Sequence, residues 1–457
     1  MALADLRPHF RPTILLAYPV VLSQLGHVMV NVVDSVVVGH TGTVPLAAVS
    51  LGVSVVTVLM VLGLGLSMGI TPLVAAADGQ RDVPRIGQLL AGGVLQCAAA
   101  GLLLTAAGWA LVPLLRYLNQ PPAVVALAAP WIRVMLLSLI PLMVFQGFRQ
   151  FAEGLGLTRQ AMQLSILANV VNAVLCYALV YGKLGAPHLG MMGAAWATLT
   201  ARTLMALLMA GYVLRAPRLQ PYRDTIGRWR FDAPTQRRLL DLGLPIGAQM
   251  VFEVGAFSVS AIMAGWLGAT VQAAHQIAIN VASVTYMAAS GISTAATIRV
   301  GRQRGLGDAA GARRAGFAAY VLTFGFMAGM GLLLVLGRHF IPQLYNTDPA
   351  VVAQAATLLL IAALFQVSDG LQVVGLGALR GLEDVKIPSL VALLAYWVLA
   401  LPLSYALGFG LGWGAGGVWL GLLAGLSAVA VVLLRRFERE THRPGLPGPE
   451  QLNETAG

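Results

Sequence analysis

The sequence predicts an all-α integral membrane protein with twelve transmembrane helices in two pseudo-symmetric six-helix bundles, an N-lobe and a C-lobe with a central cleft. Three observations support this fold class. The 457-residue chain is 58% hydrophobic and only 10% charged, with a mean hydropathy of +0.79, whereas soluble domains are about 25% charged. Apolar stretches of membrane-spanning length recur along the whole chain. Finally, the second half of the chain repeats features of the first.

Each apolar stretch is long enough to cross the hydrocarbon core of a bilayer as a helix, which needs about 20 residues. The first stretch lacks a small-residue cleavage site followed by a polar domain, so we expect a span there and not a cleaved signal peptide. The expected spans are 13–38, 46–77, 88–114, 122–148, 161–183, 189–214, 239–267, 272–298, 315–337, 350–378, 387–410 and 413–434.

The longest polar interruption, residues 215–238, lies near the middle of the chain. We interpret it as a basic cytoplasmic linker between an N-lobe, residues 1–214, and a C-lobe, residues 239–436. The last residues, 437–457, are rich in proline, glycine and polar side chains. Such a composition predicts a disordered cytoplasmic tail.

Lysine and arginine are distributed unevenly between alternate loops. Arg133 and Arg202 lie within spans, and the loops on one side hold only Arg116, Lys183 and Arg338, which leaves 24 of the 29 basic residues on the other side. Basic loops remain in the cytoplasm. We therefore expect a multi-pass protein of the bacterial inner (plasma) membrane with both termini in the cytoplasm. The net charge of +11 follows from this topology, so no nucleic-acid partner is expected.

A shift of 226 positions aligns the two halves of the chain without a gap, which indicates an internal duplication. Six helices per copy is an even number, so both copies enter the membrane in the same orientation. This predicts a parallel repeat with the substrate site between the halves. The prolines that match predict a bend in the first and seventh helices. Matching pairs include Pro19 and Pro245, Gly65 and Gly291, Thr71 and Thr297, and Asp82 and Asp308.

Three acidic residues, Asp34, Glu253 and Asp369, lie well inside the predicted spans. A charge at the bilayer centre costs about 2.5–3.5 kcal/mol even on lenient insertion scales, so such residues usually face a cavity or a partner. Each acid could instead be protonated or hydrogen-bonded for packing, or could pair with Arg133 or Arg202. Because the acids occur in both halves with few cations inside the spans, handling of a cation is favoured.

Amide side chains predict a polar interior near these acids. Asn169 and Asn172 share one face of the fifth span, and Gln276 and Asn280 share one face of the eighth. The alternative for each pair is interhelical hydrogen bonding, worth about 0.6 kcal/mol in membranes. His275 is a lone histidine that is better explained by packing than by ligand binding.

No motif for covalent or nucleotide chemistry occurs in the sequence. It has no phosphate-binding loop, no metal-spaced Cys/His cluster and no nucleophile beside a base. Cys97 and Cys176 both lie in apolar runs and are expected to be small buried residues. We expect no enzymatic activity and no cofactor, so transport would use an ion gradient or the gradient of the substrate.

Four segments carry a resemblance that covers about residues 10–435. They are "NVVDSVVVG" around Asp34, "QMVFEVGAF" around Glu253, "LGATVQAAHQIAIN", and "VSDGLQVVGLGALRGLEDVKIP", which begins two residues before Asp369. With twelve spans in tandem halves, they resemble the multidrug and toxic compound extrusion (MATE) family, most closely its NorM-type bacterial branch. The resemblance implies alternating-access export of cationic drugs and dyes in exchange for entering Na+ or H+.

The resemblance also implies roles for individual residues. Asp34 matches an acid of the N-lobe, and Glu253 and Asp369 match a C-lobe pair that handles the coupling cation and could ligate Na+. Asn172 matches the first polar residue of an N-lobe pair, but Cys176 stands where the second, Asn or Asp, is usual. Phe365 stands where NorM-type members often have tyrosine, so a cation–π face remains without a hydroxyl.

These roles predict coupling by charge exclusion. Removal from water and a neighbouring carboxylate both favour a protonated carboxyl. Glu253 and Asp369 are therefore expected to hold a proton near neutral pH, or to bind Na+ when both are ionised. Either cation removes the negative charge that retains a cationic drug. The alternative is a lipid-linked oligosaccharide flippase of the same broad superfamily, whose cleft would need cations to hold a pyrophosphate. A monomer is expected.

Overall fold

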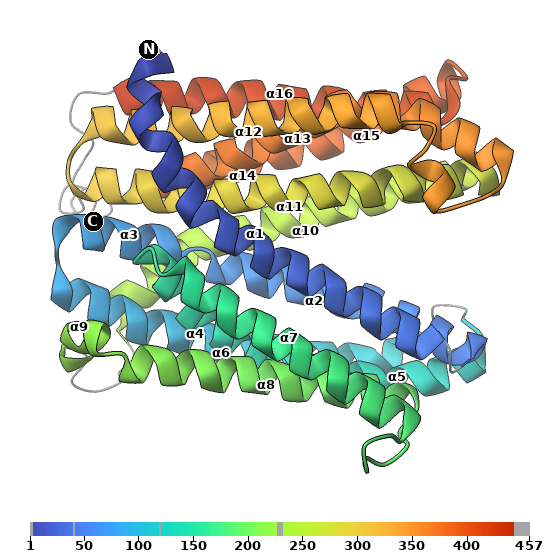
Figure 1. Cartoon of the computed structure of the whole chain (residues 1–457), viewed down its shortest axis with the longest axis horizontal. Coiled ribbons are helices and arrows are strands. Elements are labelled where there is room, and N and C mark those ends of the chain that lie inside the picture. Colours follow the sequence, from blue (N-terminus) through green and yellow to red (C-terminus); the bar gives the residue numbers. More distant parts are fainter. Residues whose placement is uncertain (1–2, 40–41, 118–119, 226–231, 443–457) are drawn as a thin grey trace. The chain divides into compact units, whose positions relative to one another are not determined.

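The computed structural model of the chain describes residues 3–39, 42–117, 120–225 and 232–442, which are helical almost throughout and contain no strand (Figure 1). Among these residues, eleven helices are long and apolar enough to cross a membrane. Helix α1 (Leu3–Gly39), with 37 residues, occupies the position of the remaining predicted span. The structure thus confirms the predicted all-α membrane fold, and each predicted span coincides with a helical stretch.

Several predicted spans consist of two or more helices in series. The second span is formed by α2 and α3, the fourth by α5 and α6, and the eleventh contains two π-helical turns, η4 and η5. The helices of the first half are α2 (Thr43–Ser67), α3 (Ile70–Gln80), α4 (Val83–Leu111), η1 (Val112–Tyr117), α5 (Pro122–Leu137), α6 (Leu139–Gly154), α7 (Thr158–Tyr181), α8 (Met191–Arg215), η2 (Pro217–Leu219) and α9 (Gln220–Asp224). Those of the second half are α10 (Ala233–Trp266), α11 (Ala269–Gly305), α12 (Ala309–Gly337), η3 (Pro342–Leu344), α13 (Pro349–Gly381), α14 (Lys386–Leu394), η4 (Ala395–Ala400), α15 (Leu401–Tyr405), η5 (Ala406–Gly410) and α16 (Gly414–His442).

The duplicated aspartates have a clear local function. Asp82 precedes α4, and its Oδ1 accepts a hydrogen bond from the backbone N–H of Arg85 at 3.0 Å. Asp308 precedes α12, and its Oδ1 accepts from the backbone N–H of Gly311 at 2.7 Å. Each carboxylate satisfies a backbone donor that has no partner within the first turn of its helix. The repeated aspartates are therefore equivalent N-caps in the two halves.

The chain divides into two compact units at positions that differ from the predicted lobe boundaries. The first-half unit is Leu22–Gly247, and the second-half unit combines Met1–Val21 with Ala248–Gly457. The divisions fall inside α1 and inside α10, 226 residues apart, so each of these helices begins in one unit and continues into the other. Apolar length locates a span, but the partners against which each part packs are not visible in composition. Helix α16 also continues to His442, beyond the predicted end of the C-lobe at 436.

The start of α1 belongs to the second-half unit and the start of α10 to the first-half unit. Each of these helix starts packs closely against a glycine of its unit. A Cβ atom on Gly65 of α2 would lie 2.4 Å from the Cα atom of Gly247, and one on Gly291 of α11 would lie 2.3 Å from Val21 Cγ2. Both distances are too short for a side chain. Gly65 and Gly291 are equivalent by the shift of 226, as are Val21 and Gly247. Both α1 and α10 remain helical through the prolines, Pro19 and Pro245, that precede these contacts.

The start of α1, the junction of α11 with α12 and the end of α16 meet at one end of the second-half unit. Arg299 Nη1 donates to the carbonyl oxygen of His9 at 2.6 Å. Arg313 Nη2 donates to Glu438 Oε1 at 3.2 Å. The first and last described helices therefore have their outer ends on the same side of this unit.

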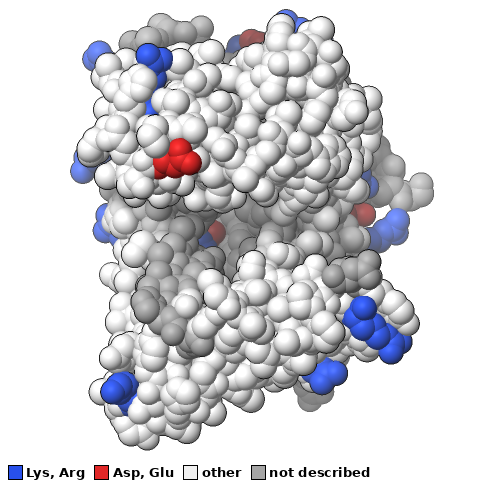
Figure 2. Space-filling view, turned by 90° about the vertical axis from the view of Figure 1, so that its right-hand side faces the viewer, with Lys and Arg blue, Asp and Glu red and all other residues white. Residues whose placement is uncertain are grey.

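The surface is suited to lipid. Most of the face drawn in Figure 2 carries neither Lys and Arg nor Asp and Glu. Large apolar side chains are exposed along the spans, including Leu103 on α4 and Leu207 on α8. Apolar surface of this extent is unusual on soluble monomers and marks contact with a partner or a membrane.

Candidate cation site

Glu253 lies on α10 inside the second-half unit, where its buried side chain accepts two hydrogen bonds. Gln249, one turn earlier on the same helix, donates from Nε2 to Glu253 Oε2 at 3.2 Å. The hydroxyl of Tyr396 donates to Oε1 at 3.3 Å. Donors from two helices favour the ionised form of this carboxylate.

Gln372 lies within hydrogen-bond distance of the Tyr396 hydroxyl. Its Nε2 donates to the tyrosine oxygen at 2.7 Å, while the hydroxyl lies 3.1 Å from Gln372 Oε1. A phenol has one proton to donate. Two acceptors lie within reach of that proton, Gln372 Oε1 at 3.1 Å and Glu253 Oε1 at 3.3 Å. Tyr396 lies in the π-helical turn η4, and such turns frequently occur at functional sites.

Asp369 lies on α13 in the same unit as Glu253. Its side chain is only 5% exposed. Among the described residues, no group donates a hydrogen bond to its Oδ1 atom. A buried carboxylate oxygen without a partner is unfavourable unless a proton or a cation satisfies it. A proton or a cation would satisfy this oxygen.

Arg380, in the last turn of α13, completes the charge balance of the site. Its Nη2 donates to Gln249 Oε1 at 3.1 Å, so it is linked to Glu253 through that amide. With both acids and the arginine ionised, the group carries a net charge of −1, which one monovalent cation would neutralise. Carboxylate, amide and hydroxyl oxygens are the ligands that hard cations prefer.

The predicted residues around this pair have different surroundings. The ring of Phe365 is buried, with centroids 5.1 Å from Trp419 and 6.2 Å from Phe257, so in this structure it lies among other aromatic side chains. His275 accepts a hydrogen bond at Nδ1 from Trp419 Nε1 at 3.1 Å, as expected of a histidine with a packing role. Gln276 and Asn280 are exposed and hydrogen-bonded to each other at 3.0 Å, which confirms that they share one helical face.

The predicted N-lobe residues belong to the first-half unit. Asn169 and Asn172 lie on α7, and Asn172 and Cys176 are both buried. A Cβ atom on Gly26 of α1 would lie 2.7 Å from Asn169 Nδ2, so α1 passes close to this amide. Asp34 is part of helix α1, but its side chain lies outside the described residues. Its predicted role, and that of the amides, stay predictions.

Cys176→Ser is expected to have a mild effect. The side chain is fully buried in α7, and serine is of similar size and can bond the carbonyl one turn earlier. We expect unchanged efflux of a cationic dye and a loss of at most about 1–2 kcal/mol in the free energy of unfolding. Loss of efflux with normal membrane expression would instead assign this position to an ion site.

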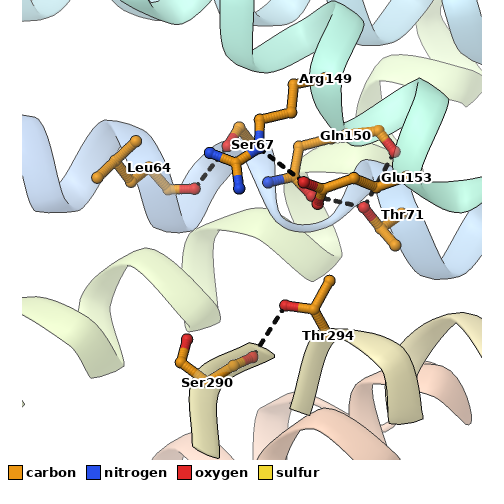
Figure 3. Close-up of polar contacts among 8 residues, drawn as sticks. All are labelled: Leu64, Ser67, Thr71, Arg149, Gln150, Glu153, Ser290 and Thr294. Carbon is orange, nitrogen blue, oxygen red and sulfur yellow. Dashed lines mark hydrogen bonds and ion pairs between the residues drawn. The ribbon is translucent and has the colours of Figure 1, made fainter. Parts of the chain in front are cut away.

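Sequence reasoning did not find the buried ion pair of the first-half unit. Arg149 and Glu153 on α6 are bonded through Nε and Oε1 at 2.6 Å and are both nearly inaccessible. Gln150, between them, accepts at Oε1 from the Thr71 hydroxyl of α3 at 2.5 Å (Figure 3). The spacing of four between opposite charges was the available signal. The side chains of Tyr396, Gln249 and Gln372 were missed because polar residues within spans are common.

The segment "GLEDVK" has a structural role at the connection of α13 and α14. Glu383 pairs with Arg304 of α11, and Asp384 accepts from Arg436 Nε of α16 at 2.5 Å. Glu383 adopts φ +60, a left-handed conformation that is rare outside glycine. Two ion pairs thus bind this short connection to α11 and α16.

Comparisons with known proteins by sequence and by fold point to the same family. A sequence model of the MatE family matches this chain twice, over residues 19–178 and 245–406. The two matches begin 226 residues apart, at Pro19 and Pro245, which confirms the internal duplication. Together they cover more than half of the chain.

Relatives match nearly the whole length of the chain. A protein of Rhodopseudomonas palustris (strain ATCC BAA-98 / CGA009) named "Probable multidrug resistance protein NorM" is 39% identical over 433 residues, 94% of this chain and 91% of that protein. A protein of the same name from Rhizobium meliloti (strain 1021) is 35% identical over 440 residues, 95% of this chain and 94% of the relative.

Solved structures share the fold at lower identity. The eukaryotic MATE transporter AtDTX14 superposes with a TM-score of 0.83 at 20% identity, covering 96% of this chain and 99% of that chain. A multidrug resistance MATE family transporter of the MOP superfamily, in its outward-facing conformation, gives a TM-score of 0.85 at 21% identity, covering 94% and 95%.

Proposed function

The chain belongs to the MatE family of transporters, and from this premise we propose that it exports organic cations, drugs and dyes, in exchange for Na+ or H+. The names of its relatives, multidrug resistance proteins, support efflux of drugs. One observation carries the coupling: two buried acids share one unit, and Asp369 Oδ1 has no hydrogen-bond partner among the described residues.

The proposed mechanism rests on competition for one negative charge. A cationic drug is retained while the group around Glu253 and Asp369 carries a net charge of −1. A proton or Na+ that binds at Asp369 removes this charge, and the drug is released. Antiport further requires that drug and coupling cation favour different conformations of the transporter. Asp34 is proposed to take part in cation coupling together with this pair. The predicted substrate and cation cleft is assigned to Asn169, Asn172, Gln276, Asn280 and Phe365.

The proposed location is the bacterial inner membrane, with both termini in the cytoplasm. Two observations support this orientation. The basic residues concentrate on one side of the spans. The outer ends of α1 and α16 lie on the same side of the second-half unit.

The test is efflux of a preloaded cationic dye from cells that lack their own exporters, at clamped pH, with and without a pulse of external Na+. Efflux that begins on Na+ addition assigns Na+ as the coupling ion. Efflux driven only by external acidification assigns a proton. A chain that extrudes dye under neither gradient is not a cation-coupled drug exporter, and a flippase of anionic lipid-linked sugars would then become the better hypothesis.

Tyr396→Phe is expected to strengthen proton binding at Glu253 without unfolding the protein. The substitution removes the hydroxyl that links Glu253 to Gln372 and leaves the ring in place. One hydrogen bond is worth about 1 kcal/mol and favours the ionised carboxylate, so the apparent affinity for a coupling proton should rise about fivefold. The measurement is dye efflux as a function of Na+ concentration or external pH. Tyr405→Phe, an exposed tyrosine of α15 in the same span, is the control and should titrate as wild type.

A further inference from the structure

A groove of about 710 Å³ lies where the chain passes from α12 to α13. One wall is the connector that follows α12, and the other is the first three turns of α13. All of its lining residues belong to the second-half unit. None of them belongs to the candidate cation site.

The groove lies on the opposite side of the bilayer from the chain termini. Helix α12 begins next to the end of α16, as the bond between Arg313 and Glu438 shows. It has 29 residues, which corresponds to about 43 Å at 1.5 Å per residue. Its last residues therefore lie across the membrane, on the side that the distribution of basic residues assigns to the outside.

The mouth of the groove is polar and carries a cation. Arg338, His339, Gln343 and Thr347 line it. Arg338 Nε donates to His339 Nε2 at 3.1 Å, which leaves the two terminal nitrogens of the guanidinium to bind another group. Among the described residues, no acid forms an ion pair with Arg338. The nearest acid in sequence, Asp348, accepts at Oδ1 from the backbone N–H of Ala350 and caps α13.

The remainder of the groove is mostly apolar and follows α13 into the membrane. Val352, Ala353, Ala356 and Leu360 line one face of the helix, interrupted by Thr357. From Pro349 to Leu360 the groove extends about 16 Å, which matches the roughly 15 Å hydrocarbon thickness of one leaflet.

This face of α13 points away from α11. Ser293 of α11 donates to the carbonyl oxygen of Val373, and Ala353 lies 20 residues earlier, on nearly the opposite side of the helix. Large apolar side chains next to Arg338 and His339 in sequence are exposed, with Leu336 73% exposed and Phe340 64% exposed. The groove therefore faces lipid.

We propose that this groove binds one anionic phospholipid of the outer leaflet, such as phosphatidylglycerol. The phosphate bonds the terminal nitrogens of Arg338, whose planar fork matches phosphate oxygens. Gln343 and Thr347 offer hydrogen bonds to the glycerol head group, and one acyl chain lies along Ala353, Ala356 and Leu360. The positive charge of Arg338 at the mouth of the groove disfavours binding of the cationic drugs of the proposed function, so this site is separate from the transport path.

The test is native mass spectrometry of the full-length protein released from detergent micelles that contain phosphatidylglycerol, phosphatidylethanolamine or inorganic phosphate. We expect one tightly held phosphatidylglycerol on the wild type and about tenfold weaker retention in Arg338→Gln. Arg338→Lys should retain an intermediate affinity, because lysine keeps the charge but not the fork. Ala353→Trp, which fills the apolar part of the groove, should also weaken lipid binding.

Arg116→Gln is the matched control. Arg116 is an exposed arginine on the same predicted side of the membrane, in the first half of the chain, over the ring of Tyr117. Equal loss of lipid in Arg116→Gln and Arg338→Gln would show unspecific attraction and overturn the proposal. So would wild-type retention in Arg338→Gln, equal retention of phosphatidylethanolamine, or displacement of the lipid by inorganic phosphate alone. Binding is measured without efflux, so the result does not depend on the proposed function.

Discussion

Asp369→Asn should abolish cation-driven dye efflux while leaving the amount of protein in the membrane unchanged. Asparagine has the size of aspartate but cannot bind a proton or carry the charge that attracts a cation. Since no group donates to Asp369 Oδ1 within the described part of the chain, the substitution breaks no hydrogen bond at that atom. We expect the efflux rate to fall to the background of cells without the transporter. The measurement is dye efflux in the presence of the coupling gradient, normalised to membrane expression.

The matched control for this experiment lies on the same helix. Asp348 caps the N-terminus of α13, and asparagine is an equally good N-cap, so Asp348→Asn should transport at the wild-type rate. If Asp369→Asn also retains that rate, Asp369 has no part in coupling. If both variants are inactive, the loss reflects α13 as a whole and not the charge of Asp369.

Glu383→Ala should destabilise the protein by about 3–5 kcal/mol, because it leaves the buried guanidinium of Arg304 without its partner. The two side chains of this pair are only 7% and 8% exposed. The segment also loses its link between α11 and the connection to α14. Unfolding in detergent, followed by the fraction that remains monodisperse after heating, measures this loss.

The control is an ion pair that water already screens. Arg313 and Glu438 are 27% and 48% exposed, so Glu438→Ala should cost about 1 kcal/mol at most. The double variant Arg304→Met with Glu383→Leu removes both charges and should recover much of the stability lost in Glu383→Ala. If Glu383→Ala and Glu438→Ala lower the thermal stability equally, the buried ion pair contributes no more than the exposed one.

The spans could be predicted because hydrocarbon imposes a length and a composition on any helix that crosses it. The duplicated halves were visible for a similar reason. Asp82 and Asp308 occupy positions where a helix start needs an acceptor, and few residue types satisfy that need. Glu253 and Asp369 stood out because carboxylates are expensive in apolar surroundings.

The partners of these acids could not be predicted. Tyr396, Gln249 and Gln372 are tolerated in many spans, so their presence alone points to no function. Their arrangement depends on the relative rotation of α10, α13 and η4, which is set by packing. That the first part of α1 belongs to the second-half unit could not be predicted for the same reason. The contact between Val21 and Gly291 joins residues about 270 positions apart in sequence.

Because the start of α1 belongs to the second-half unit, its native contacts can form only late in synthesis. The first turns of α1 are made first, yet their partner Arg299 follows 290 residues after His9. At about 5–20 residues per second, the ribosome needs roughly 15–60 s to reach it. Throughout this interval the start of α1 lacks its native neighbours. The second-half unit is the last to be completed. If a ribosome stalls between α9 and α10, the start of α1 lacks the second-half helices against which it packs, and the first-half unit lacks the start of α10.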